Sequence, residues 1–177
     1  ERIYYASIYD KQKFSDFEFC FSNIFPEVKS IKPKVITAIV DPENGIEKSL
    51  IMINLKLEND TTVKQFNISS GMFKSMMILS ELFFGNSYSP IIIDEVENSL
   101  GINCLPDILD ELNISENQVI ITTHHPRIIN NVEPKNWKII NRNGSNIIAN
   151  EAEQFINSTS HHDKFIQLIN SAIYRGK

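Results

Sequence analysis

A run of three isoleucines that ends in two acids constrains the fold of this chain most. Ile91 to Ile93 follow Pro90 and lead directly into Asp94 and Glu95. An unbroken apolar run of this length is typical of a parallel strand that is buried on both faces. In open α/β sheets, ligands bind beside the carboxyl ends of such strands. The run therefore predicts a fully buried parallel strand that carries two carboxylates to a ligand-binding edge.

A second apolar run ends in the same way. Val119 to Ile121 is followed by Thr122, Thr123 and His124. Neighbouring parallel strands end at the same edge of a sheet, so we expect the imidazole to reach the edge that carries the two acids. A single histidine at a strand end is more often structural than functional. Two adjacent strands that both end in polar, chemically active residues indicate a site.

A third segment, Ile68-Ser69-Ser70-Gly71-Met72, precedes an apolar helical run that extends to Phe84. Small residues at a helix start leave the first backbone N–H groups accessible, and these groups together with the helix dipole favour a phosphate. An ordinary helix N-cap uses the same residue types, so this segment alone decides little. The order and spacing of three residues strengthen the prediction of a site. Gly71, Asp94 and His124 follow one another at separations of 23 and 30 positions. A helix-strand-helix-strand unit would occupy these intervals.

In this order the segments resemble four motifs of an ABC-type ATPase. Ile68 to Met72 resembles the signature motif, Ile91 to Glu95 the Walker B strand, Glu97 to Gly101 the D-loop, and Ile121 to His124 the switch-histidine strand. More narrowly, they resemble the stand-alone ATPases near the RecF, SMC and OLD (overcoming lysogenisation defect) proteins, many of which are bacterial anti-phage components. The resemblance implies an α/β fold: the C-terminal part of an ABC-type ATPase head, with a parallel P-loop NTPase sheet and an antiparallel β segment.

The resemblance implies ATP and Mg²⁺ as cofactors and assigns three residues to hydrolysis. Asp94 would hold magnesium through water, a role that suits a carboxylate because magnesium prefers oxygen ligands. Glu95 would polarise the attacking water, and His124 would contact the γ-phosphate. His125 stands where such proteins commonly have Ser, which leaves the choice between the two histidines open.

The resemblance also implies a composite site between two subunits. The signature would reach the nucleotide that is held by the partner subunit's P-loop, and the D-loop would run between the two sites. The residues concerned are Ser69, Ser70 and Gly71 in the signature, and Asn98, Ser99 and Leu100 in the D-loop. The implied partners are a homodimer or higher oligomer joined by an ATP sandwich, and an effector protein such as a nuclease or toxin. DNA or RNA stays open as a partner, and no membrane is expected. The sequence departs from transporter-type signatures at Ser70 and Met72, where those proteins have Gly and Gln.

No P-loop is present in the sequence. The six glycines never fall in the Gly-x4-Gly-Lys-Ser/Thr arrangement. In the family this loop lies upstream of the signature, and the chain starts with Glu1 rather than Met, so we expect a fragment whose P-loop portion lies upstream. Whether that portion belongs to the same polypeptide or to a separate chain stays open. The predicted organisation is one C-terminal part of an ATPase domain over residues 1–177, with a β-rich lead-in at 1–66, the core at 67–142 and a terminal hairpin and helix at 143–177.

Composition narrows the class further. The chain has 177 residues, of which 42% are hydrophobic, and this suits one domain with a sizeable core. A net charge of −5 argues against a basic nucleic-acid-binding domain, although other parts of a longer protein could contact DNA. Cys20 and Cys104 have no metal-ligand spacing, so a reduced, cytoplasmic protein is expected. No apolar run approaches the roughly 20 residues of a membrane span.

Periodicity and turn signals predict the remaining elements. The phenylalanine-rich stretch from Phe14 to Phe25 fits a helix or a strand equally well. In the segment Ser49 to Glu58, Ile51, Ile53, Leu55 and Leu57 should face the core while the alternate residues face water. His161 and His162 lack partners at ligand spacing and predict no metal site. The other expected elements are strands at Ile3–Tyr9, Lys34–Asp41, Ser49–Glu58 and Thr62–Phe66, helices at Met72–Phe84, Gly101–Leu112, Pro126–Val132 and Asp163–Tyr174, a hairpin of Trp137–Asn141 with Asn146–Ala149, and a loop at Asn157–His162. Pro106 interrupts the helix at Gly101–Leu112 and fits its first turns if the helix begins near Leu105.

Three functions fit these observations. The first is an ATP-driven switch in an anti-phage defence complex that controls an effector. The second is a DNA-repair or chromosome-associated ATPase of RecF or SMC kind, and the third is a non-hydrolysing scaffold that only holds a nucleotide. An intact Glu95 argues against the scaffold. In the alternative interpretation, Asp94 and Glu95 are a structural pair whose charges are satisfied locally, and no site exists.

Overall fold

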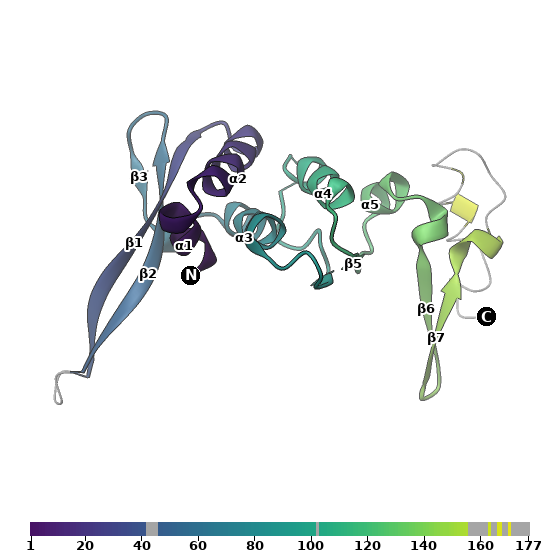
Figure 1. The fold of residues 1–177 in the computed structure, drawn as a ribbon. Helices are drawn as coiled ribbons and strands as arrows, with labels where there is room; N and C mark the ends of the chain where they lie inside the picture. The colour runs from purple at the N-terminus through teal and green to yellow at the C-terminus, as the bar shows by residue number, and fades with distance from the viewer. Residues whose placement is uncertain (42–45, 102, 156–162, 164–165, 168–169, 171–177) are drawn as a thin grey trace. The chain divides into compact units, whose positions relative to one another are not determined.

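The computed structural model describes residues 1–41, 46–101, 103–155, 163, 166–167 and 170 (Figure 1). It divides into two compact units, Glu1–Ile121 and Thr122–Lys177, which are described separately below. Within the described residues, none of the helices has the length and apolar character needed to cross a membrane.

The first unit begins with two helices, α1 (Arg2–Tyr9) and α2 (Lys11–Ile24). The prediction of a strand at Ile3–Tyr9 is therefore wrong. Its β-branched and aromatic residues favour a strand locally, but Ile3 and Ala6 are buried at a spacing of three, so packing against α2 and α3 selects the helix.

Burial of the phenylalanines in α2 follows the helical period rather than the strand period. Phe17 and Phe21 are fully buried, whereas Phe19 is 69% exposed. In a strand these three side chains would lie on one face, but in a helix only residues four apart share a face. The Phe17 ring lies 5.0 Å from the ring of Phe84 and 6.0 Å from that of Phe83, both on helix α3 (Ser70–Phe84). This contact joins α2 to the helix that carries the predicted signature.

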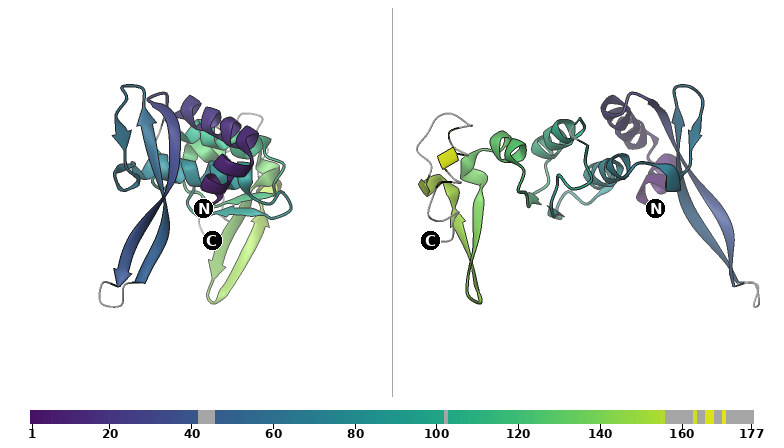
Figure 2. Two further views of the ribbon diagram at one scale, coloured as in Figure 1. Left: turned by 60° about the vertical axis from the view of Figure 1, so that its left-hand side comes forward. Right: turned by 180° about the vertical axis from the view of Figure 1, so that it is seen from behind.

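An antiparallel sheet follows, with strand order β1-β2-β3. It consists of β1 (Val28–Asp41), β2 (Ile46–Leu57) and β3 (Thr62–Val63), and β1 with β2 forms the long hairpin seen in Figure 2. The predicted antiparallel segment is confirmed. Its third strand ends early because the 3₁₀ turn η1 (Gln65–Asn67) follows it. The predicted wet face of β2 is wrong at Asn54, which is buried.

The predicted helix is confirmed as α3, and it ends where the sequence indicates. The Gly85 N–H donates to Glu81 O at 2.8 Å, which closes the last turn. Gly85 has an extended backbone, with φ −73° and ψ 177°. A Cβ there would lie 2.2 Å from Glu81 O, so lack of space, rather than a left-handed conformation, requires this glycine.

The two apolar runs form a parallel pair, β4 (Ile91–Ile93) and β5 (Val119–Ile121), joined by helix α4 (Leu105–Ile114). The parallel pairing is confirmed, but full burial is wrong. Ile92 and Ile120, which are register partners, are 70% and 46% exposed. Ile91, whose side chain points to the other face, is buried. The described pair therefore has one covered and one open face.

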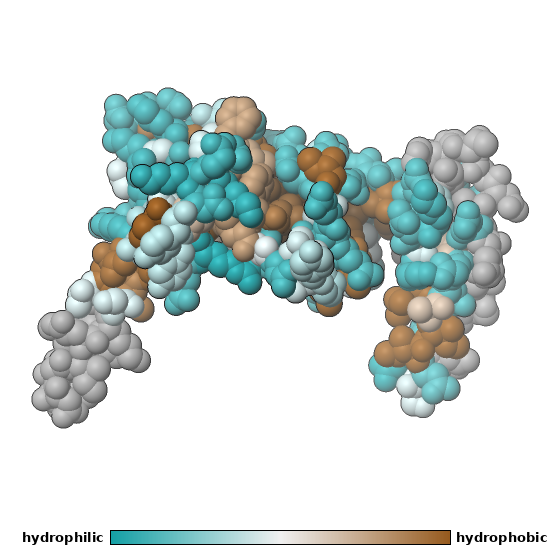
Figure 3. All heavy atoms as spheres, in the orientation of Figure 1, coloured by the Kyte–Doolittle hydropathy of each residue, from teal (hydrophilic) through white to brown (hydrophobic). Residues whose placement is uncertain are grey.

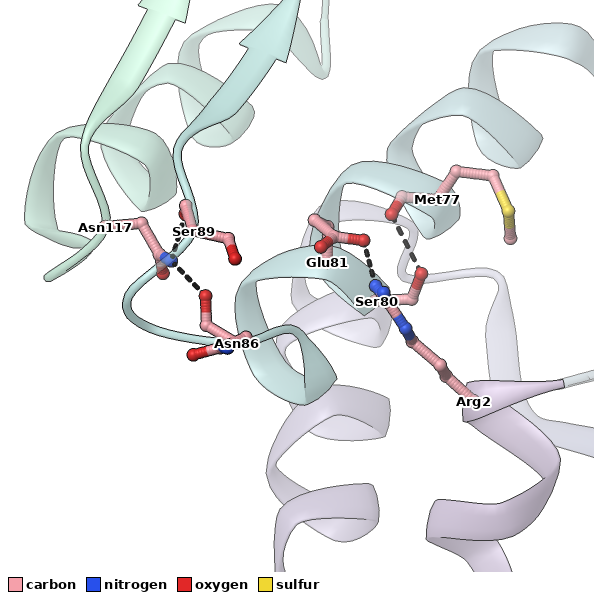
Figure 4. Close-up of polar contacts among 7 residues, drawn as sticks. All are labelled: Arg2, Met77, Ser80, Glu81, Asn86, Ser89 and Asn117. Carbon is pink, nitrogen blue, oxygen red and sulfur yellow. Dashed lines mark hydrogen bonds and ion pairs between the residues drawn. The ribbon is translucent and has the colours of Figure 1, made fainter.

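The loops that lead into β4 and β5 are tied together by one side chain (Figure 4). Asn117 Nδ2 donates to Asn86 O at 3.1 Å and to Ser89 O at 3.2 Å. On the far side of α3, Arg2 pairs with Glu81 and so fastens α1 to α3. The Asn117 bonds hold the two strand-entry loops together, and the Arg2–Glu81 pair holds α1 on α3.

The second unit contains α5 (Pro126–Asn131) and the hairpin β6 (Lys138–Asn143) with β7 (Asn146–Glu151), flanked by 3₁₀ turns η2 (Pro134–Asn136) and η3 (Ala152–Phe155). The predicted helix and hairpin are confirmed. The small core joins Ile139 and Ala152 with the partly buried Ile129 and Trp137. The hairpin exposes Ile140, Ile147 and Ile148. Figure 3 shows a hydrophobic patch on this hairpin. The loop at Asn157–His162, including His161 and His162, lies outside the described residues, as does most of the helix at Asp163–Tyr174.

Candidate functional site

The predicted signature forms an exposed helix start. Ser69 is the N-cap of α3, and its hydroxyl oxygen accepts a hydrogen bond from the Met72 N–H at 3.2 Å. Ser69 and Ser70 are exposed, and Gly71 is partly buried. The first turn of an α-helix presents backbone donors and the positive end of the dipole to any anion that approaches. This geometry suits contact with a phosphate.

The two acids stand in a tight turn after β4. Asp94 and Glu95 are both exposed, and the Asn98 N–H donates to Glu95 O at 2.8 Å. Asn98 Nδ2 also donates to Glu95 Oε2 at 3.4 Å. Glu95 has φ 43° and Ser99 has φ 64°, both in the left-handed region. Such conformations cost about 1–3 kcal/mol for residues with a Cβ and are concentrated at functional sites.

Gly71 joins the helix start to the predicted D-loop. A Cβ on Gly71 would lie 3.0 Å from Ser99 O and 3.4 Å from Gly101 N. Both neighbours are backbone atoms, so they cannot rotate away. The glycine is needed here for close approach of two backbone segments rather than for an unusual φ. The predicted signature and D-loop are therefore in direct contact within one chain.

Lys74 makes a second link, which sequence reasoning missed. Its Nζ donates to Glu95 O at 2.9 Å and to Asn98 O at 2.7 Å. Gly71 and Lys74 are three residues apart and so lie on the same side of α3. A cation one turn inside the predicted signature helix was the available signal. The positive φ of Glu95 had no sequence signal, because Glu is not a residue type that favours this region.

A buried contact supports the loop from below. The Ser75 hydroxyl, fully buried on α3, donates to Cys104 Sγ at 3.9 Å, and the Cys104 thiol donates to Gly101 O at 3.4 Å. The D-loop is therefore attached to α3 near its beginning, through Lys74 and Gly71, and at its end, through Cys104. Cys104, which precedes α4, therefore has a structural role in holding the loop. In the described ranges, no group of three or more His, Cys, Asp or Glu side chains could hold a metal ion.

The predicted histidine lies in the second unit, three residues after β5. His124 is exposed. Its neighbour His125 is the N-cap of α5, and His125 Nδ1 accepts a hydrogen bond from the Arg127 N–H at 3.3 Å. The His125 N–H donates in turn to Thr123 Oγ1 at 3.0 Å. His125 therefore has a structural role at the start of α5.

Two hollows on the surface of the first unit lie away from these residues. Tyr5, Val35 and Leu50 line one, between α1 and the β1–β2 hairpin. Ile53 and Phe73 belong to the other, beside α1, β2 and α3. Neither includes the acids or the D-loop. In the first unit, Ser69, Ser70, Asp94 and Glu95 are all exposed.

Solved structures define the class of fold. The Smc head domain with a coiled coil and joint from Pyrococcus yayanosii matches with a TM-score of 0.55 and 15% identity, over 92% of this chain and 29% of that chain. A second solved structure has the description "Structural biochemistry of ATP-driven dimerization and DNA stimulated activation of SMC ATPases". It matches with a TM-score of 0.48 and 18% identity, over 90% of this chain and 94% of that chain. The fold is that of an SMC-type ATPase head, and this chain spans less than a third of the first structure's chain.

The chain belongs to the family of AAA domains described as putative AbiEii toxin, Type IV TA system, whose family model matches residues 4–130. The matched range contains the predicted signature, both acids, the predicted D-loop and His124. No curated protein matches this chain. The predicted α/β fold of an ABC-type ATPase head is confirmed.

Proposed function

We propose that this chain binds and hydrolyses ATP in composite sites formed between two ATPase heads. One group of contacts carries the proposal. The helix start at Gly71 meets the backbone of Ser99, and Lys74 on the same helix holds Glu95 through its carbonyl oxygen. A phosphate-type helix start is thus joined to an acid whose backbone is strained and whose side chain is exposed.

The carboxylates suit magnesium and water. Asp94 and Glu95 offer oxygen ligands at the carboxyl end of β4, and Mg²⁺ commonly binds one or two carboxylates together with nucleotide phosphates. Asp94 would hold the ion through water, and the ion would neutralise charge on the phosphates. Glu95 would orient the attacking water and accept its proton. The Asn98 side chain helps to orient the Glu95 carboxylate.

The remaining roles follow from position along the chain. His124 would contact the γ-phosphate, because His125 is committed to capping α5. Ser69, Ser70 and Gly71 would contact the nucleotide held by the partner head, and Asn98, Ser99 and Leu100 would form the loop between the two sites. The phosphate cradle would come from a P-loop outside this stretch. A homodimer or higher oligomer is the expected assembly.

For the biological output, we propose an ATP-driven switch in a cytoplasmic anti-phage defence complex that controls an effector such as a nuclease or toxin. The family description, which names a toxin and a type IV TA system, supports this role. The two free cysteines suit a reducing compartment. The second candidate is a DNA-linked ATPase of RecF or SMC kind, favoured by the SMC-head fold. Turnover that DNA stimulates severalfold, without protection against phage, would favour the second candidate.

Glu95→Gln in the full-length protein tests the enzymatic proposal. The amide keeps the size of the side chain but cannot accept a proton, so turnover should fall about 100-fold or more while ATP binding is retained. Glu58→Gln, at an exposed carboxylate beyond the end of β2, is the matched control and should keep normal turnover. Equal turnover by Glu95→Gln and the unmodified protein would refute the role of Glu95.

A further inference from the structure

Lys74 holds the turn that carries Glu95 through two carbonyl oxygens. An ammonium group has three donors and no acceptor, and two of these donors reach Glu95 O and Asn98 O at 2.9 and 2.7 Å. Hydrogen bonds from a charged donor are roughly twice as strong as neutral ones. The lysine is partly buried, so water competes less for its donors than at an open surface. The two bonds from Lys74 therefore contribute to holding the conformation of the turn.

The turn needs such support. Glu95 has φ 43°, and a strained backbone persists only where its surroundings fix it in place. The two bonds from Lys74 and the bond from the Asn98 N–H to Glu95 O help to hold this turn. The two from Lys74 come from another element, helix α3. Without its ammonium group the turn can relax, and the Glu95 carboxylate then changes direction.

The same helix start touches the loop at a second point. Gly71 lies beside Ser99 O, where even a Cβ would come within 3.0 Å, so a shift of the first turn of α3 toward the loop would press on the D-loop backbone. Lys74, three residues further along, carries the same shift to Glu95 O. Any force on the exposed serines at the N-terminus of α3 is thus transmitted to the acid through two separate contacts.

We propose that Lys74 is a positioning residue that couples the two composite sites. This inference rests on the proposed function. Ser69 to Gly71 would contact the nucleotide of the partner head, whereas Glu95 would act on the nucleotide of its own head. Lys74 connects the two within one chain, so engagement of one nucleotide sets the acid for the other. Turnover should consequently be cooperative in ATP, and Lys74 should be required for both the rate and the cooperativity.

The test compares Lys74→Met and Lys74→Arg in the full-length protein, with ATP turnover measured over a range of ATP concentrations. Misplacement of a catalytic group by about 1 Å can reduce a rate about 100-fold, so Lys74→Met should lose 10- to 100-fold in kcat. Its ATP affinity should stay within about twofold, and its Hill coefficient should fall toward one. Lys74→Arg should recover part of both, because a guanidinium can donate to two carbonyls. Lys13→Met, at an exposed position on α2, is the matched control.

Hydrogen exchange separates positioning from folding. In Lys74→Met, amides of residues 95–101 should exchange faster while those in the middle of α3 keep their protection. Normal kcat and Hill coefficient in Lys74→Met, with an active unmodified protein, would overturn the coupling and leave the proposed function intact. Loss of ATP binding, or of protection throughout α3, would reduce Lys74 to a folding role and also overturn the inference. An unmodified protein that neither binds nor hydrolyses ATP would refute the proposed function itself, and the coupling with it.

Discussion

Truncation of Phe17 tests how the first unit is packed. The Phe17 ring is fully buried between α2 and α3, with ring centroids of Phe84 and Phe83 at 5.0 and 6.0 Å. Phe19 lies on the same helix and is 69% exposed. Phe17→Ala and Phe19→Ala make the same chemical change two residues apart. Their difference therefore measures burial alone.

The expected difference follows from the structure. Removal of a fully buried phenylalanine costs about 3–5 kcal/mol, part of which is the loss of ring-to-ring contacts. An exposed site changes the free energy of unfolding by about 0.5 kcal/mol or less. Both variants gain the same few tenths of a kcal/mol in helix propensity, which cancels. The two should differ by about 3 kcal/mol, or roughly 100-fold in the opening equilibrium.

Hydrogen exchange followed by mass spectrometry on the full-length protein measures this equilibrium. Phe17→Ala should lose roughly 100-fold of protection in the peptides of α2 and α3, and Phe19→Ala should lose almost none. If the stretch were a strand, both rings would lie on one face and both variants would lose protection equally. Equal losses would therefore refute the helical packing of α2 on α3.

Two further predictions concern the loop and a thiol. Gly71→Ala should lower stability, because the new methyl would press on the backbone atom Ser99 O at 3.0 Å; turnover should also fall, and more than in Gly101→Ala, where the methyl would meet Cys104 Sγ at 4.0 Å. Unchanged turnover in Gly71→Ala would contradict the close contact. Burial, reinforced by the carboxylate of Glu111, raises the pKa of Cys20 from 9.0 to about 12. Cys20 should therefore alkylate slowly at pH 8.5 and faster in Glu111→Gln, and its contribution to stability should be lost as the pH rises from 9.0 toward 12, because the unfolded thiol releases its proton first. Alkylation rates measured against pH check this, and a half-maximal rate near pH 9.0 would be inconsistent with the buried thiol.

The sequence predicts those parts of the fold that depend on local pattern. The apolar runs at β4 and β5, the helix that follows Gly71 and the hairpin around Gly144 all follow from periodicity or turn residues. Ile3 to Tyr9 fails because contacts with α2 and α3, distant in sequence, override the strand propensity of its side chains. Exposure of Ile92 could not be predicted, since it depends on what covers the sheet.

The candidate site, like the fold, could be predicted from the sequence only in part. Its residue types and their order were readable, because a family resemblance attaches a role to each motif. The contacts that join the motifs were not, because they depend on backbone geometry. The left-handed φ of Glu95, the approach of Gly71 to Ser99 and the two bonds from Lys74 have no signature in the sequence.

The measurement that tests the central claim most directly is the mass of Glu95→Gln full-length protein with and without ATP and Mg²⁺, followed by light scattering. A composite site that cannot hydrolyse its nucleotide should hold two heads together, so the mass should at least double when ATP binds. Ser70→Arg in the same background should still bind ATP but stay at the lower mass, because a long side chain at the exposed start of α3 blocks the facing nucleotide. A mass that does not change at saturating ATP, or one that rises equally in the Ser70→Arg variant, would contradict the account.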